Sequence, residues 1–163
     1  MEKKDLKAFK KLGEEEEQDI LAQADIVCCT CVCAGDNRLK NFMFKHVLVD
    51  EATQAVEPEC LIPMTCGARQ AILLGDHCQL GPVVLNKQAE LAGHGRSLFE
   101  RMVLCDRVPV MLSIQYRMHP FLAKWSSQSF YEGELHDGVT ARDRDSTGIF
   151  PWRSSSMPTI FHH

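Results

Sequence analysis

Four short apolar runs, separated by polar segments, constrain the fold of this chain most. They are rich in small and β-branched residues, and two of them, FKHVLVD and QAILLGD, end on an acidic residue. Apolar runs of this length that stop at turn residues are typical of buried strands. The segments between them have helical character, and this alternation predicts an α/β layered fold with a parallel sheet. The predicted strands are residues 24–32, 44–50, 70–76 and 108–117.

Helix signals fill the intervals between these runs. The first segment is polar and helix-forming, and Gly13 is expected to break or bend it. Ser97 followed by Glu100 is a capping-box pattern, which is typical of a helix start. Proline suits the first turn of a helix, so two prolines mark two further starts. Helices are therefore expected over 2–24, from Pro58, over 97–104, and from Pro120 to about Phe130.

Composition narrows the class of protein. Apolar residues make up 45% and charged residues 25% of the 163 positions, which is typical of a globular chain. With 18 basic and 22 acidic side chains the net charge is −4, so overall charge gives no sign of nucleic-acid binding, although a local basic groove stays open. The N-terminus lacks the apolar stretch of a secretory signal, and no run approaches the ~18 apolar residues of a membrane span. We therefore expect a cytoplasmic protein, with the nucleus as the alternative, and no membrane partner.

Eight cysteines raise the question of a metal site. Four of them crowd into CCTCVC (28–33), and the other four are scattered singly. Structural zinc sites usually take two separated pairs such as CxxC. The spacing therefore favours buried, reduced thiols over zinc.

The block VLVDEATQ (47–54) places Asp50 and Glu51 at the end of a predicted strand. A carboxylate there can hold Mg²⁺ through its water shell, because Mg²⁺ keeps most of its waters and needs few protein ligands. A second acid can polarise an attacking water. One interpretation makes Asp50 the metal-binding residue and Glu51 the water-orienting residue. The other is two acids in an exposed turn.

The block GDHCQLGP (75–82) follows the next predicted strand. Asp76 is expected to fix this loop by accepting hydrogen bonds. Gln79 could contact both a γ-phosphate and a catalytic water, since an amide both donates and accepts. His77 next to Cys78 does not favour a metal site, because adjacent ligands lack further partners. A plain strand-to-loop connection is the alternative for the whole block.

The block QYRMHP (115–120) supplies Arg117. A planar guanidinium matches phosphate oxygens and can neutralise charge in a transition state, although a structural salt bridge is an equally ordinary role for arginine. Tyr116 could stack on a base or pack in the core. Gln115 and His119 are expected to seat the loop.

The three blocks in this order are far more specific than any one of them. Together they resemble motifs II, III and IV of the Upf1-like group of superfamily 1 helicases, and most closely those of its nonsense-mediated mRNA decay branch. The resemblance covers roughly residues 20–150. It extends to the flanking text ADIVCCTCVCAGDNRL (24–39), EPECLIPM (57–64), SLFERMV (97–103) and FYEGELHDGVTARDR (130–144).

The resemblance implies an incomplete RecA-like parallel sheet with flanking helices, of the P-loop NTPase class. Residues 1–114 would form the C-terminal part of a first RecA-like domain with preceding helices, and residues 115–163 the start of a second. ATP and Mg²⁺ would bind between the two domains. Single-stranded RNA, or DNA, would cross their tops.

The resemblance also implies catalytic roles for four residues. Asp50 would bind the hydrated magnesium ion, and Glu51 would act on the catalytic water. Gln79 would sense the γ-phosphate, and Arg117 would reach it across the cleft between the domains.

Three further residues are implied in binding. Gln54 would contact the nucleotide and couple its site to the surroundings. Tyr116 would also contact the nucleotide. Thr30 lies where the family contacts nucleic acid, with a core strand position as its alternative. Cys33 stands where the family usually has glycine, which is a mild departure.

The larger departure is the phosphate loop, because no GxxxxGK[ST] occurs in the 163 residues. The resemblance thus implies a fragment of an ATP-dependent RNA helicase, with mRNA surveillance proteins as partners of the full-length parent. We expect the isolated chain to be inactive, since the phosphates would lack their backbone cradle and lysine. The alternatives are an inactive truncated copy that acts as a binding module, and a fragment of a DNA-directed superfamily 1 helicase.

Overall fold

The computed structural model describes residues 3–144, which form two compact units that divide between Arg107 and Val108. The first unit contains one parallel strand pair and most of the helices, and the second contains a helix and a shorter strand pair. In chain order the elements are α1 (Lys3–Gln23), η1 (Cys33–Gly35), β1 (His46–Val49), α2 (Glu57–Met64), β2 (Gln70–Leu73), α3 (Lys87–Ala89), η2 (Glu90–His94), α4 (Leu98–Leu104), β3 (Ile114–Gln115), α5 (Pro120–Phe130), β4 (His136–Asp137) and η3 (Arg142–Arg144).

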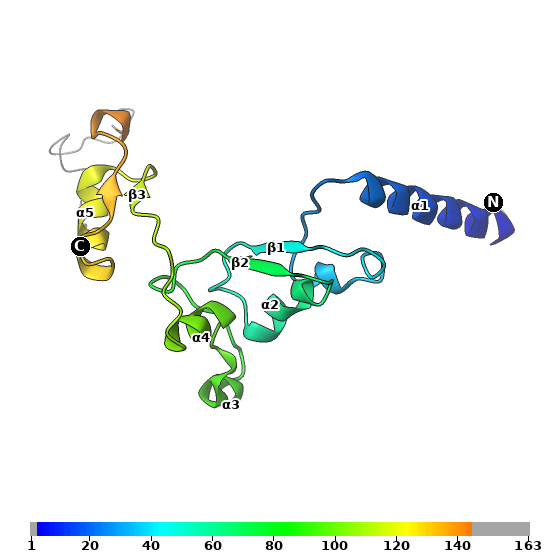
Figure 1. The fold of residues 1–163 in the computed structure, drawn as a ribbon, viewed down its shortest axis with the longest axis horizontal. Coiled ribbons are helices and arrows are strands. Elements are labelled where there is room, and N and C mark those ends of the chain that lie inside the picture. Colours follow the sequence, from blue (N-terminus) through cyan, green and yellow to red (C-terminus); the bar gives the residue numbers. More distant parts are fainter. Residues whose placement is uncertain (1–2, 145–163) are drawn as a thin grey trace, which may run out of the picture. The chain divides into compact units, whose positions relative to one another are not determined.

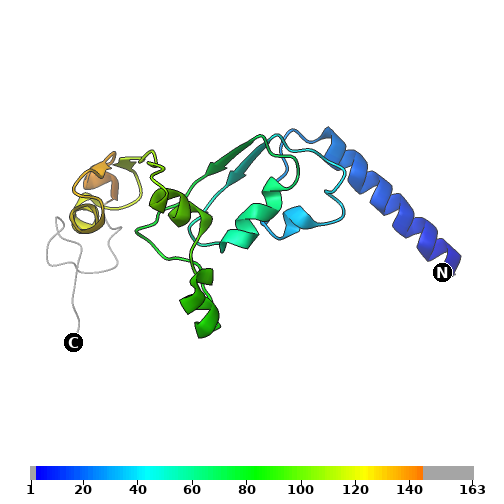
Figure 2. The ribbon, with the colours of Figure 1, turned by 60° about the horizontal axis from the view of Figure 1, so that its bottom comes forward.

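The first unit is built on the parallel pair β1 and β2, whose residues match in the register His46 to Gln70 through Val49 to Leu73. The two strands lie side by side with α2 along one face (Figure 1). Figure 2 shows the same arrangement after rotation, with α2 still beside the strands. The predicted strands at 44–50 and 70–76 and the helix from Pro58 are therefore confirmed, and the parallel pairing supports the predicted α/β class.

A small core lies where these elements meet. The buried side chains of Val49, Ala52, Cys60 and Leu98 form one cluster. They come from the end of β1, the turn that follows it, α2 and α4. The core therefore holds together the segments that surround the carboxyl ends of the two strands.

The opposite face of the strand pair is open among the described residues. Val47 and Val49 face the core, whereas Leu48 is 60% exposed and its register partner Ile72 is 43% exposed. Successive side chains of a strand point to opposite faces, so one covered face buries only every second residue. The prediction that these strands are buried is wrong for that face.

The predicted strand over 24–32 is also wrong. Its residues are mostly exposed and pair with no strand within residues 3–144. The chain turns at Thr30, whose carbonyl accepts the Ala34 N–H at 3.1 Å and whose hydroxyl accepts the Cys33 N–H at 3.3 Å. Such local hydrogen bonds compete with strand pairing, and here they lead into η1.

The helix predictions fare better. α1 runs unbroken through Gly13, so the expected break there is wrong; no other group lies within 4 Å of a Cβ at that position. α4 begins after Ser97, whose hydroxyl accepts the Glu100 N–H at 3.1 Å, which confirms the predicted cap. α5 begins at Pro120, as expected.

No helix in the described part of the chain is long and apolar enough to cross a membrane.

The cysteines are all free thiols, but only Cys60 is buried. Burial raises the pKa of the Cys60 thiol, and its S–H lies 3.8 Å from the Ala52 carbonyl oxygen. Cys28, Cys29 and Cys33 are exposed, because the segment that carries them is not a strand. The prediction of buried thiols is therefore wrong for most of the CCTCVC run.

The second unit pairs β3 with β4 in parallel, so that Ile114 matches His136 and Gln115 matches Asp137. The strand predicted over 108–117 is therefore mostly wrong, because only two of its residues pair. Val108 and Val110 are about 90% exposed in the extended segment before β3. The assignment of residues 1–114 and 115–163 to two RecA-like domains stays a prediction, and residues 145–163 lie outside the described part.

Candidate functional site

The turn after β1 holds the two predicted acids. Asp50 and Glu51 are both exposed directly beyond the last residue of the strand. The Glu51 N–H donates to Asp50 Oδ1 at 3.1 Å, and Gln54 Nε2 donates to Glu51 Oε2 at 3.0 Å. Glu51 has a φ of 51°, a left-handed conformation that is uncommon for a residue other than glycine. The structure thus brings Asp50, Glu51 and Gln54 together in one turn.

This turn packs directly against the loop that follows β2. The Leu74 N–H donates to the Val49 carbonyl at 2.9 Å, and the Ala52 N–H donates to the Leu74 carbonyl at 2.7 Å. A Cβ on Gly75 would lie 2.9 Å from Thr53 Cγ2 and 3.0 Å from the Thr53 backbone nitrogen. Glycine is therefore required for this approach, and the two predicted blocks meet at the carboxyl edge of the strand pair.

Asp76 fixes the second loop, as predicted. Its Oδ1 accepts the Cys78 N–H at 3.0 Å, and its Oδ2 accepts from Gln79 Nε2 at 2.6 Å. The Gln79 N–H donates to the Asp76 carbonyl at 3.1 Å. Gln79 is exposed, so the bond to Asp76 orients an amide that solvent and ligands can reach.

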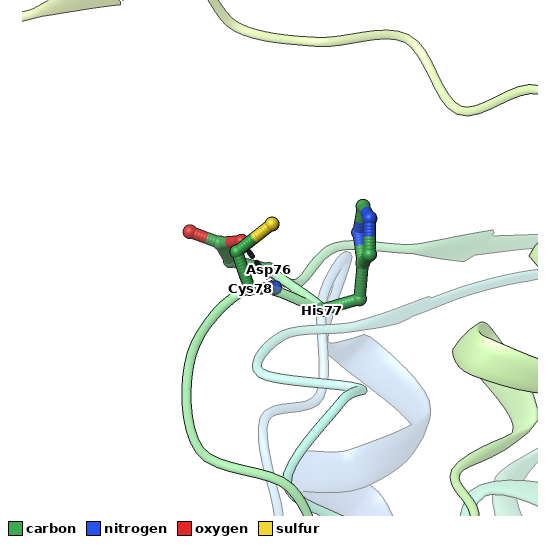
Figure 3. Close-up of side chains that lie close together, drawn as sticks. All are labelled: Asp76, His77 and Cys78. Atoms are coloured by element: carbon green, nitrogen blue, oxygen red, sulfur yellow. Dashed lines mark hydrogen bonds between the residues drawn. The ribbon is translucent and has the colours of Figure 1, made fainter. Parts of the chain in front are cut away.

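The side chains of Asp76, His77 and Cys78 extend to the same side of this loop (Figure 3). One ligand atom from each of the three lies within 4.8 Å of the other two, so Asp76 supplies the further partner that His77 and Cys78 were expected to lack. The His77 ring stacks on Phe99 of α4, with ring centroids 6.2 Å apart and an interplanar angle of 23°. Burial, and then the neighbouring Asp76 carboxylate, raise the pKa of the Cys78 thiol.

Sequence reasoning missed Thr53. It is 3% exposed, and its Oγ1 is buried without a hydrogen-bond partner among the described residues. The sequence carries no signal for it, because one small polar residue beside Asp50 and Glu51 has no spacing that marks it as buried. Thr53 also leaves no room for a side chain at position 75, so its role at this edge is steric as well as polar.

An ion pair joins α2 and α4, two helices that contribute to the same core. Arg101 of α4 donates from Nε and one terminal nitrogen to the two carboxylate oxygens of Glu57 on α2, each at 2.7 Å. Hydrogen bonding to Arg101 lowers the pKa of Glu57. The pair joins two helices that both contribute to the core, and sequence reasoning did not find it.

Gln115 organises the third block, in the second unit. Its Oε1 accepts the N–H groups of Arg117 at 2.9 Å and Met118 at 2.7 Å. Its Nε2 donates to the Met118 carbonyl at 2.9 Å and to Asp137 Oδ1 at 2.6 Å. His119 Nδ1 accepts the Phe121 N–H at 3.1 Å and so caps α5. The prediction that Gln115 and His119 seat this loop is confirmed.

The seated loop leaves two side chains exposed. Arg117 is exposed, and within residues 3–144 no ion pair holds its guanidinium group. Tyr116 is 59% exposed, and its ring lies against Gly138, where a Cβ would come within 2.3 Å of the ring. Tyr116 is therefore not a core residue. That Arg117 reaches the same phosphate as Gln79 stays a prediction.

Thr30 is exposed on the segment between α1 and η1. The alternative of a core strand position is therefore wrong. Its contact with nucleic acid stays a prediction.

Comparisons with known proteins identify the family. Residues 1–87 match one family model described as an AAA domain, and residues 94–163 match a second with the same description. A relative from Arabidopsis thaliana named "Regulator of nonsense transcripts 1 homolog" is 53% identical over 159 residues, which are 97% of this chain and 13% of the relative. The "ATP-dependent helicase NAM7" of Saccharomyces cerevisiae is 52% identical over 96% of the chain and 16% of the relative. The "ATP-dependent helicase upf1" of Schizosaccharomyces pombe is 48% identical over 97% of the chain and 17% of the relative.

The chain thus spans less than a fifth of the length of these relatives, while almost all of it matches them. The match includes the three blocks whose geometry is described above, and it runs across both units. This chain therefore belongs to the AAA-domain family, and nearly all of it is similar to one part of the Upf1 and regulator of nonsense transcripts 1 relatives named above.

Proposed function

We propose that the carboxyl edge of β1 and β2 is the metal, water and γ-phosphate end of an ATP-hydrolysing site. In this proposal the chain is part of the core of an ATP-dependent RNA helicase of the nonsense-mediated decay type, acting in the cytoplasm. The packing of Thr53 against Gly75 carries the proposal, because it fixes the turn with Asp50 and Glu51 against the loop with Gln79.

Asp50 fits a hydrated magnesium ion. Its carboxylate is exposed at a strand end, and the one hydrogen bond it accepts from Glu51 leaves most of its lone pairs for metal-bound water. Mg²⁺ prefers such hard oxygen donors and keeps its own waters. Bound there, the ion would supply positive charge to the phosphate oxygens.

Glu51 and Gln79 are suited to handle the attacking water. Gln54 holds one oxygen of Glu51 and leaves the other free to accept a proton from a water. Gln79 has one amide hydrogen directed to Asp76, and the other is available to a phosphate oxygen. The amide oxygen of Gln79 can accept a hydrogen bond from the attacking water, so Gln79 can orient this water toward the phosphorus.

Arg117, Tyr116 and Thr30 complete the proposal from outside this edge. The exposed guanidinium of Arg117 would neutralise charge that develops on the phosphoryl group. Tyr116 would stack on the base of the nucleotide, and Thr30 would contact single-stranded RNA. The names of the relatives support ATP as the nucleotide and transcripts as the substrate.

A chimera tests the proposal. The segment of the Saccharomyces cerevisiae relative that matches this chain would be replaced by these residues, and RNA-stimulated ATP hydrolysis would be measured. The chimera should hydrolyse ATP, and Glu51→Gln within it should lower kcat by about 10²–10⁴-fold, the usual contribution of a general acid–base group.

Glu16→Gln on α1 is the matched control, since it removes an exposed carboxylate far along the chain from the three blocks. Its kcat should equal that of the unmodified chimera. A chimera that binds RNA but never hydrolyses ATP would contradict the proposal and favour the binding-module alternative. So would hydrolysis that Glu51→Gln leaves unchanged.

A further inference from the structure

The loop after β2 brings three different metal-ligand types onto one side. Asp76, His77 and Cys78 offer an oxygen, a nitrogen and a sulfur atom that lie within 4.8 Å of one another. From this geometry we propose that the three residues bind one divalent cation of the Zn²⁺ class. This proposal goes beyond ATP hydrolysis and does not depend on it.

Two of the three ligands are already oriented. Asp76 is held by the hydrogen bonds from Cys78 N–H and Gln79 Nε2. The His77 ring is stacked on Phe99, which fixes the plane of the imidazole. All three side chains leave the loop on the same side, as Figure 3 shows. Little conformational freedom is therefore lost on binding.

The distances require only small movements. Two ligands of one zinc ion lie no farther apart than the sum of their bond lengths, about 4.4 Å for sulfur and nitrogen. The present limit of 4.8 Å exceeds this by a few tenths of an ångström. Rotation about the side-chain bonds of Cys78 can close such a gap while His77 stays stacked on Phe99.

The donor set selects the metal. Thiolate and imidazole suit Zn²⁺, Co²⁺ and related ions, whereas Mg²⁺ and Ca²⁺ prefer oxygen alone. Three protein ligands leave a fourth position for water, and His77 is exposed, so an ion has a path from solvent.

Binding is coupled to protons. A bond forms between the cation and the Cys78 sulfur as the thiol releases its proton to solvent, and the cation offsets the burial and the Asp76 charge that oppose the thiolate.

Cobalt titration of the 163-residue chain tests the proposal, because a thiolate bound to Co²⁺ gives a charge-transfer band in the near ultraviolet. The exposed cysteines at 28, 29 and 33 could bind Co²⁺ as well, so the background is the variant with Cys28→Ser, Cys29→Ser and Cys33→Ser. Cys31 is kept, since it packs against the core. In this background one equivalent of Co²⁺ should give the band, and Zn²⁺ should displace it.

Cys78→Ser should remove the band. His77→Ala should weaken Zn²⁺ binding by at least ~10–100-fold, the cost of losing even an outer-shell partner. Cys105→Ser, at an exposed cysteine elsewhere in the first unit, is the control and should keep the band. Circular dichroism confirms that each variant keeps its secondary structure. A band that survives Cys78→Ser, a band that disappears with the triple background, or no band at all would overturn the proposal.

Discussion

At the scale of single residues, the position of the site depends on a contact between two uncharged residues. Gly75 and Thr53 decide how closely the two loops approach, whereas Asp50 and Glu51 are exposed and take no part in that packing. Sequence reasoning found Asp50, Glu51, Asp76 and Gln79 because charged and amide groups in ordered blocks stand out. It missed Thr53 because a buried hydroxyl in a short block has no distinguishing spacing.

Gly75→Ala should destabilise the first unit by about 1–3 kcal/mol, the usual cost of forcing extra volume into a packed site. The new Cβ would meet the backbone nitrogen of Thr53 at 3.0 Å, and backbone cannot move aside as a flexible side chain can. Urea denaturation followed by circular dichroism measures the difference.

Gly81→Ala is the matched control in the same loop, since no atom lies within 4 Å of its Cβ. It should leave stability unchanged or raise it by about 0.4–1 kcal/mol by restricting the unfolded chain. Equal stability of the two variants would show that the contact between Thr53 and Gly75 does not hold the loops together.

At the scale of elements, helix starts could be predicted from sequence and strands only partly. Ser97 and Pro120 mark helix starts through local chemistry, since a cap or a proline acts within one turn. A strand needs a partner that may lie far away in sequence. The CCTCVC run and the segment before Ile114 have strand-like composition, but within the described residues they find no such partner over most of their length.

The pair between Glu57 and Arg101 makes the junction of α2 and α4 sensitive to pH. Arg101 lowers the pKa of Glu57 in the folded chain, so the stabilisation is present above the unfolded value of about 4.3 and is lost as pH falls through the folded value. The loss of stability caused by Glu57→Gln should therefore be clear at pH 6 and should shrink toward zero at pH 3. Thermal unfolding at each pH measures it.

Glu59→Gln provides the comparison on the same turn of α2, where the carboxylate makes no ion pair with the described residues. Its effect on thermal unfolding should depend less on pH than that of Glu57→Gln. If the two variants follow the same pH profile, Arg101 contributes nothing specific.

At the scale of the whole molecule, the family and the blocks could be predicted from sequence, but the amount of buried surface could not. The second face of the β1–β2 pair and residues such as Leu85, Val108 and Val110 expose large apolar side chains. The apolar pattern of these residues predicts buried strands and packed loops. The pattern alone does not show whether the segments that would bury these side chains lie in this chain. Relatives more than five times as long match it across nearly its whole length.

The 163-residue chain by itself should therefore show no RNA-stimulated ATP hydrolysis above the rate of its own Glu51→Gln variant. Its acids, glutamine and arginine can act only on a phosphate that is held in place, and the sequence contains no GxxxxGK[ST] to hold the β- and γ-phosphates. Phosphate release from ATP, measured with and without single-stranded RNA, tests this. Turnover that Glu51→Gln abolishes would mean that these residues position the nucleotide without a phosphate loop. The chimera with the yeast relative distinguishes two causes of inactivity. If the chimera hydrolyses ATP, the isolated chain lacks only the phosphate loop; if it does not, the carboxyl edge of β1 and β2 is itself inactive.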